Sequence, residues 1–107
     1  NPAPYENRGA AYRKKGQYDK AIEDYNKAIS IKPSFGYFGR ARTYSLQNNE
    51  SFACDSLRLA FENAHEKRKT AMKEKLDDSD FDKIRNNDCF KKIAHTTEKK
   101  EKKKRRY

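Results

Sequence analysis

The chain has 107 residues, of which 34% are hydrophobic and 39% charged, and its net charge is +10. A chain of this length and polarity forms one domain with a thin core, which argues against a large enclosed active-site cavity. No run of residues approaches the roughly 18 apolar positions of a membrane-spanning helix, and we expect an intracellular protein, cytoplasmic or nuclear.

Two helices are predicted at the N-terminus. Residues 4–15 form the first, with Pro4 in the first turn, where a missing N–H costs nothing, and Gly16 ends it. Residues 18–31 form the second, because apolar side chains recur there every three or four residues and so share one face. Pro33 stops this helix, since the residue before a proline avoids helical geometry.

A second pair of helices is predicted at residues 35–47 and 51–62. Asn48 and Asn49 make the turn between them, because Asn tolerates left-handed backbone geometry. No proline closes this pair. His65 stands at the equivalent place, so the helix is free to run on.

The remaining sequence is less periodic. Residues 65–77 predict a fifth helix with few apolar positions, and the acidic run at 77–80 breaks it and caps the next segment. Residues 96–107 have no apolar periodicity and are predicted to form a disordered tail or a fraying helix end. The last strong apolar anchors, which we expect to cap the fold, are Phe81, Ile84, Phe90 and Ile93. The basic residues of the tail are Lys99, Lys100, Lys102, Lys103, Lys104, Arg105 and Arg106.

The two helix pairs share one register, offset by 32 residues. Small residues recur at small positions, and aromatic or large apolar residues at large ones. The first copy has Tyr5, Gly9, Tyr12, Ala21, Tyr25 and Ala28, and the second has Tyr37, Ala41, Tyr44, Ala53, Leu57 and Ala60. A fixed period of this size is typical of helical repeat arrays, which generally serve as binding surfaces.

The first copy resembles a tetratricopeptide repeat. That family's order of Trp, Leu-Gly, Tyr, Ala, Phe, Ala and Pro is matched by Tyr5, Arg8-Gly9, Tyr12, Ala21, Tyr25, Ala28 and Pro33. Arg8 departs from the pattern and Arg40 repeats the departure, which predicts a surface position. The second copy matches more weakly, and residues 78–90 resemble the closing segment of some proteins of this family. We therefore predict an all-α solenoid of two such hairpins over 2–64 (2–33 and 34–64), a capping segment over 65–95 and the basic tail over 96–107.

The resemblance implies a non-catalytic interaction module, in which the first helix of each repeat lines a concave groove that holds a peptide or partner helix. Arg13, Arg42 and Phe38 would suit an acidic or C-terminal peptide with an apolar residue, because Arg can bind a carboxylate with two donors. The alternative is that these are ordinary solvated positions. The Lys and Asn that clamp chaperone tails in this family are replaced by Glu6 and Ala10, which argues against that class of partner. The implied groove residues are Glu6, Asn7, Ala10, Arg13, Lys14, Phe38, Gly39, Arg42, Ser45 and Leu46.

The sequence offers no catalytic or metal-binding pattern. Cys54 and Cys89 lie in no CxxC pair; a disulfide between them is open, but we expect two free thiols in a reducing compartment. Together with His65 and His95 they match no zinc spacing. We therefore predict neither an enzyme nor a cofactor.

Two other interactions stay open. Residues 91–107 hold nine Lys or Arg and two Glu, a balance of +7, against +3 for the rest. The tail therefore supports an alternative function as a nucleic-acid-associated adaptor, with weak, non-specific binding. Because the chain begins at Asn1 without Met, we expect a piece excised from a longer protein, whose open N-terminal face under Tyr5 and Tyr12 could self-associate.

Overall fold

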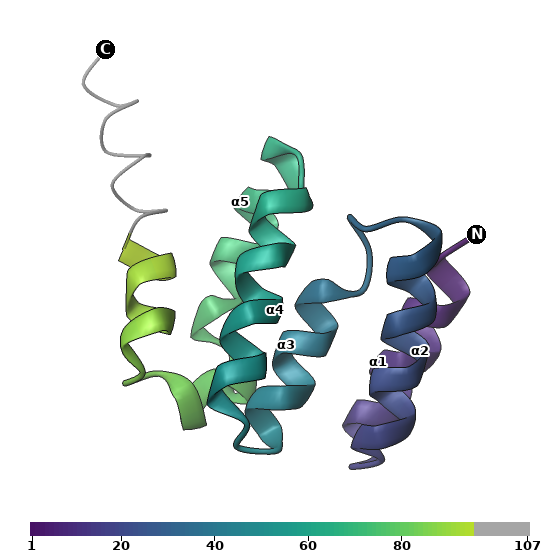
Figure 1. Ribbon diagram of the computed structural model, residues 1–107, viewed down its shortest axis with the longest axis horizontal. Coiled ribbons are helices and arrows are strands. Elements are labelled where there is room, and N and C mark those ends of the chain that lie inside the picture. Colours follow the sequence, from purple (N-terminus) through teal and green to yellow (C-terminus); the bar gives the residue numbers. More distant parts are fainter. Residues whose placement is uncertain (96–107) are drawn as a thin grey trace.

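The computed structural model describes residues 1–95, so the basic tail lies outside the described residues. No strand occurs in this part, and the predicted all-α class is confirmed. Two antiparallel helical hairpins lie side by side, and the C-terminal segment packs on the second (Figure 1). The elements are α1 (Ala3–Lys14), α2 (Tyr18–Ile31), α3 (Tyr37–Leu46), α4 (Glu50–Asn63), α5 (Glu66–Glu74), the 3-10 segments η1 (Lys75–Asp77) and η2 (Ser79–Ile84), and a helical stretch at residues 88–95.

The turns within the hairpins have the predicted chemistry. Gly16 has a φ of 79° and Asn48 a φ of 60°, so both adopt left-handed geometry. α2 ends at Ile31, and Lys32 is extended ahead of Pro33.

The second hairpin ends differently from our expectation that its last helix could run on. Ala64 is extended, and the Nδ1 atom of His65 accepts a hydrogen bond from the Arg68 N–H at 3.4 Å. His65 thus serves as the N-cap of α5 and separates it from α4.

Tyr25 connects the two hairpins. Its ring lies against Gly9 of its own hairpin and Gly39 of the next, where a Cβ atom on Gly39 would overlap the ring. The family resemblance placed Gly39 in the groove, but in the structure its missing side chain lets α3 approach α2.

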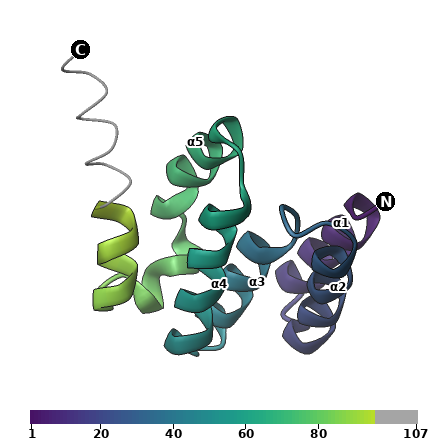
Figure 2. The same cartoon turned by 45° about the horizontal axis from the view of Figure 1, so that its top comes forward.

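The hydrophobic core lies between the second hairpin and the C-terminal segment. Phe81 is completely buried, and its ring centroid is 5.5 Å from that of Phe38 and 5.7 Å from that of Phe90. The buried core residues of this cluster are Ala41, Ala53, Leu57, Leu76, Phe81, Ile84 and Phe90, and Ile93 packs against them at the margin. The first hairpin and residues 88–95 lie at opposite ends of the array (Figures 1 and 2).

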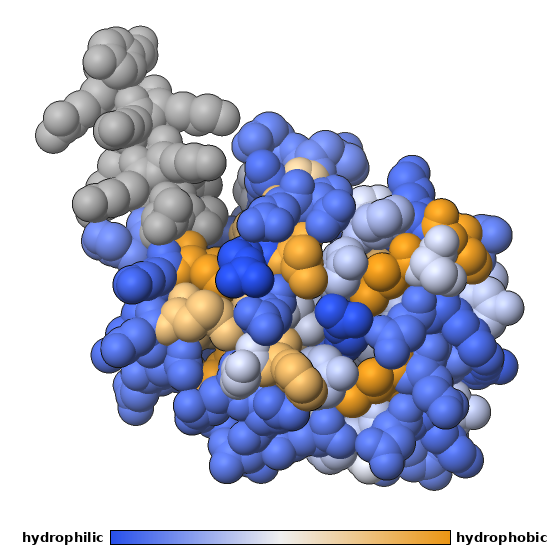
Figure 3. Space-filling model, in the orientation of Figure 1, coloured by the Kyte–Doolittle hydropathy of each residue, from blue (hydrophilic) through white to orange (hydrophobic). Residues whose placement is uncertain are grey.

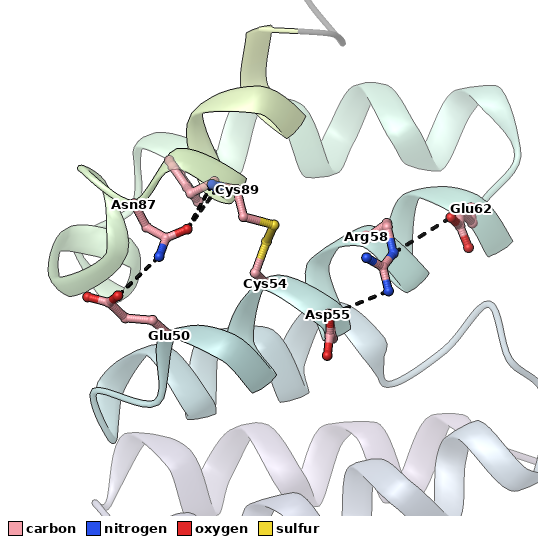
Figure 4. The surroundings of a disulfide bond; sticks show 8 residues. Glu50, Cys54, Asp55, Arg58, Glu62, Asn87 and Cys89 are labelled. Carbon is pink, nitrogen blue, oxygen red and sulfur yellow. Dashed lines mark hydrogen bonds and ion pairs between the residues drawn. A yellow bond between two sulfur atoms is a disulfide. The ribbon is translucent and has the colours of Figure 1, made fainter.

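The two cysteines form a disulfide, so the prediction of free thiols is wrong (Figure 4). Their Cα atoms are 6.2 Å apart, within the range that a disulfide spans. The C-terminal segment folds back over α4 and brings Cys89 against the buried Cys54, a long-range contact that spacing could not reveal. Asn87 supports this junction, since its Oδ1 accepts from the Cys89 N–H at 2.8 Å and its Nδ2 donates to Glu50 at 3.0 Å.

Candidate binding groove

The face predicted to bind a peptide is covered by the chain itself. η2 packs against α3, and its residues reach the side chains that α1 and α3 place on this face. Ser45, one of the predicted groove residues, is buried, and its hydroxyl donates to the Asp80 carbonyl at 2.6 Å.

Asp78 and Asp80 pair with the two predicted groove arginines. Arg13 Nε lies 3.4 Å from an Asp80 carboxylate oxygen. Arg42 Nη1 lies 3.4 Å from Asp78 and 3.8 Å from Asp80. All three separations exceed the 2.7–2.9 Å of a strong charge-assisted hydrogen bond, so the pairs are loose.

The Arg13 side chain is held in place by a hydrogen bond to Tyr25. Only 8% of its side chain is exposed, and its Nη1 donates to the Tyr25 hydroxyl at 2.9 Å. Burial raises the pKa of Tyr25, and the nearby positive charge of Arg13 opposes that rise. The hydroxyl therefore stays neutral and accepts the guanidinium donor, which fixes Arg13 at the floor of the groove.

Arg42 has unused donor capacity. Its guanidinium carbon lies 5.1 Å from the ring centroid of Phe38, which favours a cation–π contact. Its Nε atom is buried and has no hydrogen-bond partner among residues 1–95. Such an atom normally finds a partner when it is buried, so the contacts with Asp78 and Asp80 leave this donor of Arg42 unsatisfied.

The carboxylate of Asp78 has two roles. It accepts a hydrogen bond from the Asp80 N–H at 3.2 Å and so caps η2. This bond lowers the pKa of Asp78, and the charges of Arg42 and Arg13 lower it further. Asp78 is therefore ionised at neutral pH and bears a negative charge at the edge of the groove.

Glu6, another of the predicted groove residues, is bound by other parts of the chain. Its carboxylate accepts from the Gly36 N–H at 2.8 Å and from Arg68 Nη2 at 3.2 Å. Glu6 therefore fastens α1 to α5 and to the loop between the hairpins. Gly36 has a φ of 94°, which glycine adopts without strain. In this conformation its N–H donates to the Glu6 carboxylate.

A hollow of about 410 Å³ remains between the loose ion pairs and the end of α1. Three cationic and two anionic side chains line it, together with one aromatic and one aliphatic side chain. Its lining residues are Arg13, Lys14, Tyr18, Arg42, Leu46, Asp78 and Asp80.

The structure thus brings Arg13, Lys14, Arg42 and Leu46 together, whereas Glu6 binds Gly36 and Arg68 instead. Asn7 is exposed and Ala10 is half-buried. The sequence does not predict Asp78 and Asp80 as groove residues, because an acidic run at this place is better explained by helix capping. One signal was available: an acidic run directly followed by Phe81 has the acidic and apolar chemistry expected of a groove ligand.

The N-terminal face carries tyrosines beneath cations. Arg8 and Lys27 lie 5.9 and 5.7 Å from the ring centroid of Tyr5, and Lys20 lies 5.7 Å from that of Tyr12. On the face shown in Figure 3, hydrophobic residues are interspersed among hydrophilic ones. Self-association through Tyr5 and Tyr12 remains a prediction.

Residues 1–95 contain neither a metal-binding cluster nor a membrane-spanning helix. No group of three or more His, Cys, Asp or Glu side chains there is placed to hold a metal ion. In the same part of the chain, no helix has the length and hydropathy needed to cross a bilayer.

Comparison with known protein families supports the repeat predicted for the first hairpin. Residues 2–35 match the family model of the tetratricopeptide repeat. No solved structure significantly matches the chain. The matched range covers α1, α2 and the loop after them, so the first hairpin is identified as a tetratricopeptide repeat.

Proposed function

We propose that this chain is a non-catalytic protein-interaction module that binds acidic segments of a partner protein through Arg13 and Arg42. Tetratricopeptide repeats generally mediate protein–protein interactions. The finer assignment, to this groove and to acidic ligands, is our own.

The observation that carries the proposal is the loose pairing of the groove arginines. Arg8, outside the groove, holds Asp24 with two bonds of 2.7 and 2.8 Å. The shortest separation between Arg13 or Arg42 and a carboxylate oxygen is 3.4 Å. Because a guanidinium can bind a carboxylate with two parallel donors, Arg13 and Arg42 retain capacity for a better-placed carboxylate.

The residues that line the hollow support a peptide as the ligand. Lys14 adds a third positive charge on its rim, and Tyr18 and Leu46 supply apolar surface beside the charges. A site with a few charged anchors and some apolar lining suits a short segment that bears both carboxylates and an apolar side chain.

A binding measurement tests the proposal. The probe is the fluorescein-labelled peptide Asp-Asp-Ser-Asp-Phe-amide, followed by fluorescence anisotropy at moderate salt. Arg42→Gln should weaken its binding roughly tenfold, since it removes a charged donor. Arg58→Gln, which removes a charge on the exposed side of α4, is the matched control and should bind as the wild type does.

The ligand itself needs a control as well. The same peptide with Asn in place of Asp should not bind. Equal weakening by the two arginine substitutions, or equal binding of the Asp and Asn peptides, would refute the assignment to this groove.

A further inference from the structure

We infer that Asp78 and Asp80 act as an internal competitor, so that a partner binds by exchanging its carboxylates for theirs on Arg13 and Arg42. This inference rests on the proposed function and adds how the site is regulated and what its ligand must contain. The exchange leaves the fold of the C-terminal segment in place.

The backbone around the two aspartates is anchored independently of their charges. Phe81 and Ile84 are both buried in the core. Arg85 donates to the Leu76 carbonyl at 3.1 Å and to the Asp78 carbonyl at 3.0 Å. Rotation of the aspartate side chains therefore frees the arginines and gives up the Asp78 cap of η2, while the apolar core stays closed.

The aspartate side chains are also the accessible part of the contact. The side chain of Asp78 is 36% exposed and that of Asp80 23%, whereas those of Arg13 and Arg42 are 8% and 13% exposed. The carboxylates can move into water, where they are well solvated. The two arginines stay in place, since Arg13 is tied to Tyr25 and Arg42 lies over Phe38.

The geometry also defines the partner's chemistry. Arg42 pairs with both aspartates, whereas of these two carboxylates Arg13 pairs with that of Asp80. A ligand that replaces them needs two carboxylates separated by one residue. The chain's own carboxylates occupy the arginines for part of the time. The apparent affinity for such a ligand is therefore the intrinsic affinity multiplied by the fraction of time that the arginines are free.

The test uses two charge-matched double variants of the full chain. Asp78→Asn/Asp80→Asn removes the competing charges, and an asparagine side chain at the first of these positions can still cap η2. Asp77→Asn/Asp82→Asn removes the same charge from exposed neighbours that pair with Arg85. We expect the first variant to bind labelled Asp-Asp-Ser-Asp-Phe-amide roughly tenfold more tightly than the wild type, and the second to bind within about twofold of it.

Three outcomes are distinguishable. Tighter binding by the first variant alone supports the competitor. Equal binding by both variants, with Arg42→Gln still weakening it, overturns the competitor and leaves the proposed function intact. An absence of binding in every variant overturns both.

The folding of the variants is checked by thermal unfolding. If Asp78→Asn/Asp80→Asn does not fold, Asp80→Asn alone keeps the Asp78 cap and removes the carboxylate that pairs with both arginines. Its binding should then be tighter than that of Asp82→Asn, and equal binding by these two single variants would overturn the inference.

Discussion

Arg8 and Asp24 form a bidentate ion pair between α1 and α2, with Nε and Nη2 of the arginine 2.7 and 2.8 Å from the two carboxylate oxygens. The Arg8 side chain is 55% exposed, while that of Asp24 is 3% exposed. In the second hairpin Arg40 takes the place of Arg8 and donates to Ser56 at 3.0 Å. The surface position predicted for these arginines therefore also joins the two helices of each repeat.

The Arg8–Asp24 pair makes stability depend on pH. The hydrogen bonds from Arg8 lower the pKa of the Asp24 carboxyl below its usual range. A carboxyl whose folded pKa is lowered contributes stability above its unfolded pKa, about 3.9, and loses it as the pH falls through the folded pKa. The stability deficit of Arg8→Gln relative to the wild type should thus be constant near pH 7 and shrink below about pH 4, as measured by urea unfolding.

The second hairpin supplies the control for this measurement. Arg40 donates to Ser56 and to Asn26, and neither partner titrates. The deficit of Arg40→Gln should therefore be the same at both pH values. A deficit of Arg8→Gln that also ignores pH would show that the charge on Asp24 does not matter.

The contact of Tyr25 with Gly39 predicts a steric cost. Gly39→Ala places a methyl group inside the Tyr25 ring, so we expect a loss of about 1–3 kcal/mol in the free energy of unfolding, despite the better helix propensity of Ala. The smaller Tyr25→Leu side chain, which copies Leu57 of the second hairpin, should recover part of that loss in the double variant. Thermal unfolding of the three proteins measures this. A Gly39→Ala protein as stable as the wild type would exclude the close packing.

The parts of this fold that the sequence could predict are local. The spacing of Ala21, Tyr25 and Ala28 identifies a helix face, and Gly16 and Pro33 bound the helix through their own backbone preferences. The repeated register extended the prediction to the second hairpin. Each of these signals acts within a few residues, which is why the bounds of the four hairpin helices agree with the structure to within about two residues. The predicted fifth helix, 65–77, ends as an α-helix at Glu74 and continues as the 3-10 segment η1.

The parts that could not be predicted depend on long-range closure. The places of Arg13 and Arg42 in the repeat predict them as groove residues. Their partners, Asp78 and Asp80, come from a segment whose path over α3 is set by the burial of Phe81. The disulfide has the same origin. No periodic pattern encodes where a non-repeating segment packs, so these contacts required the three-dimensional structure.

The alternative function of the basic tail predicts a salt-dependent affinity. Binding to a single-stranded oligonucleotide by several Lys and Arg residues releases counterions, so its affinity should fall steeply as NaCl rises. Lys102→Glu/Lys103→Glu/Lys104→Glu should reduce both the affinity and the salt slope, whereas Arg42→Gln should change neither. Fluorescence anisotropy with a labelled oligothymidine measures both. Binding that ignores salt would contradict the electrostatic interpretation.

The Cys54–Cys89 disulfide predicts stability that depends on the oxidation state. The bond joins cysteines 35 residues apart in the chain, and restricting the unfolded chain in this way stabilises the folded state by about 3–4 kcal/mol. Dithiothreitol should therefore lower the urea midpoint of the wild type and leave that of Cys54→Ala/Cys89→Ala unchanged. Thiol titration in guanidinium without reductant should find no free thiol in the wild type, and two free thiols would contradict the bond.

The same bond predicts a change in local motion on reduction. Residues 88–95 include Cys89, and Phe90 packs on Phe81, so reduction should loosen the segment that places Asp78 and Asp80 on the groove. We expect faster amide hydrogen exchange at 78–90 in the reduced protein than in the oxidised one, because segments with fewer constraints open more often. Exchange in α1 and α2, which the bond does not touch, should stay unchanged and serves as the internal control. Equal exchange at 78–90 in both oxidation states would show that the burial of Phe81 alone holds the segment on the groove.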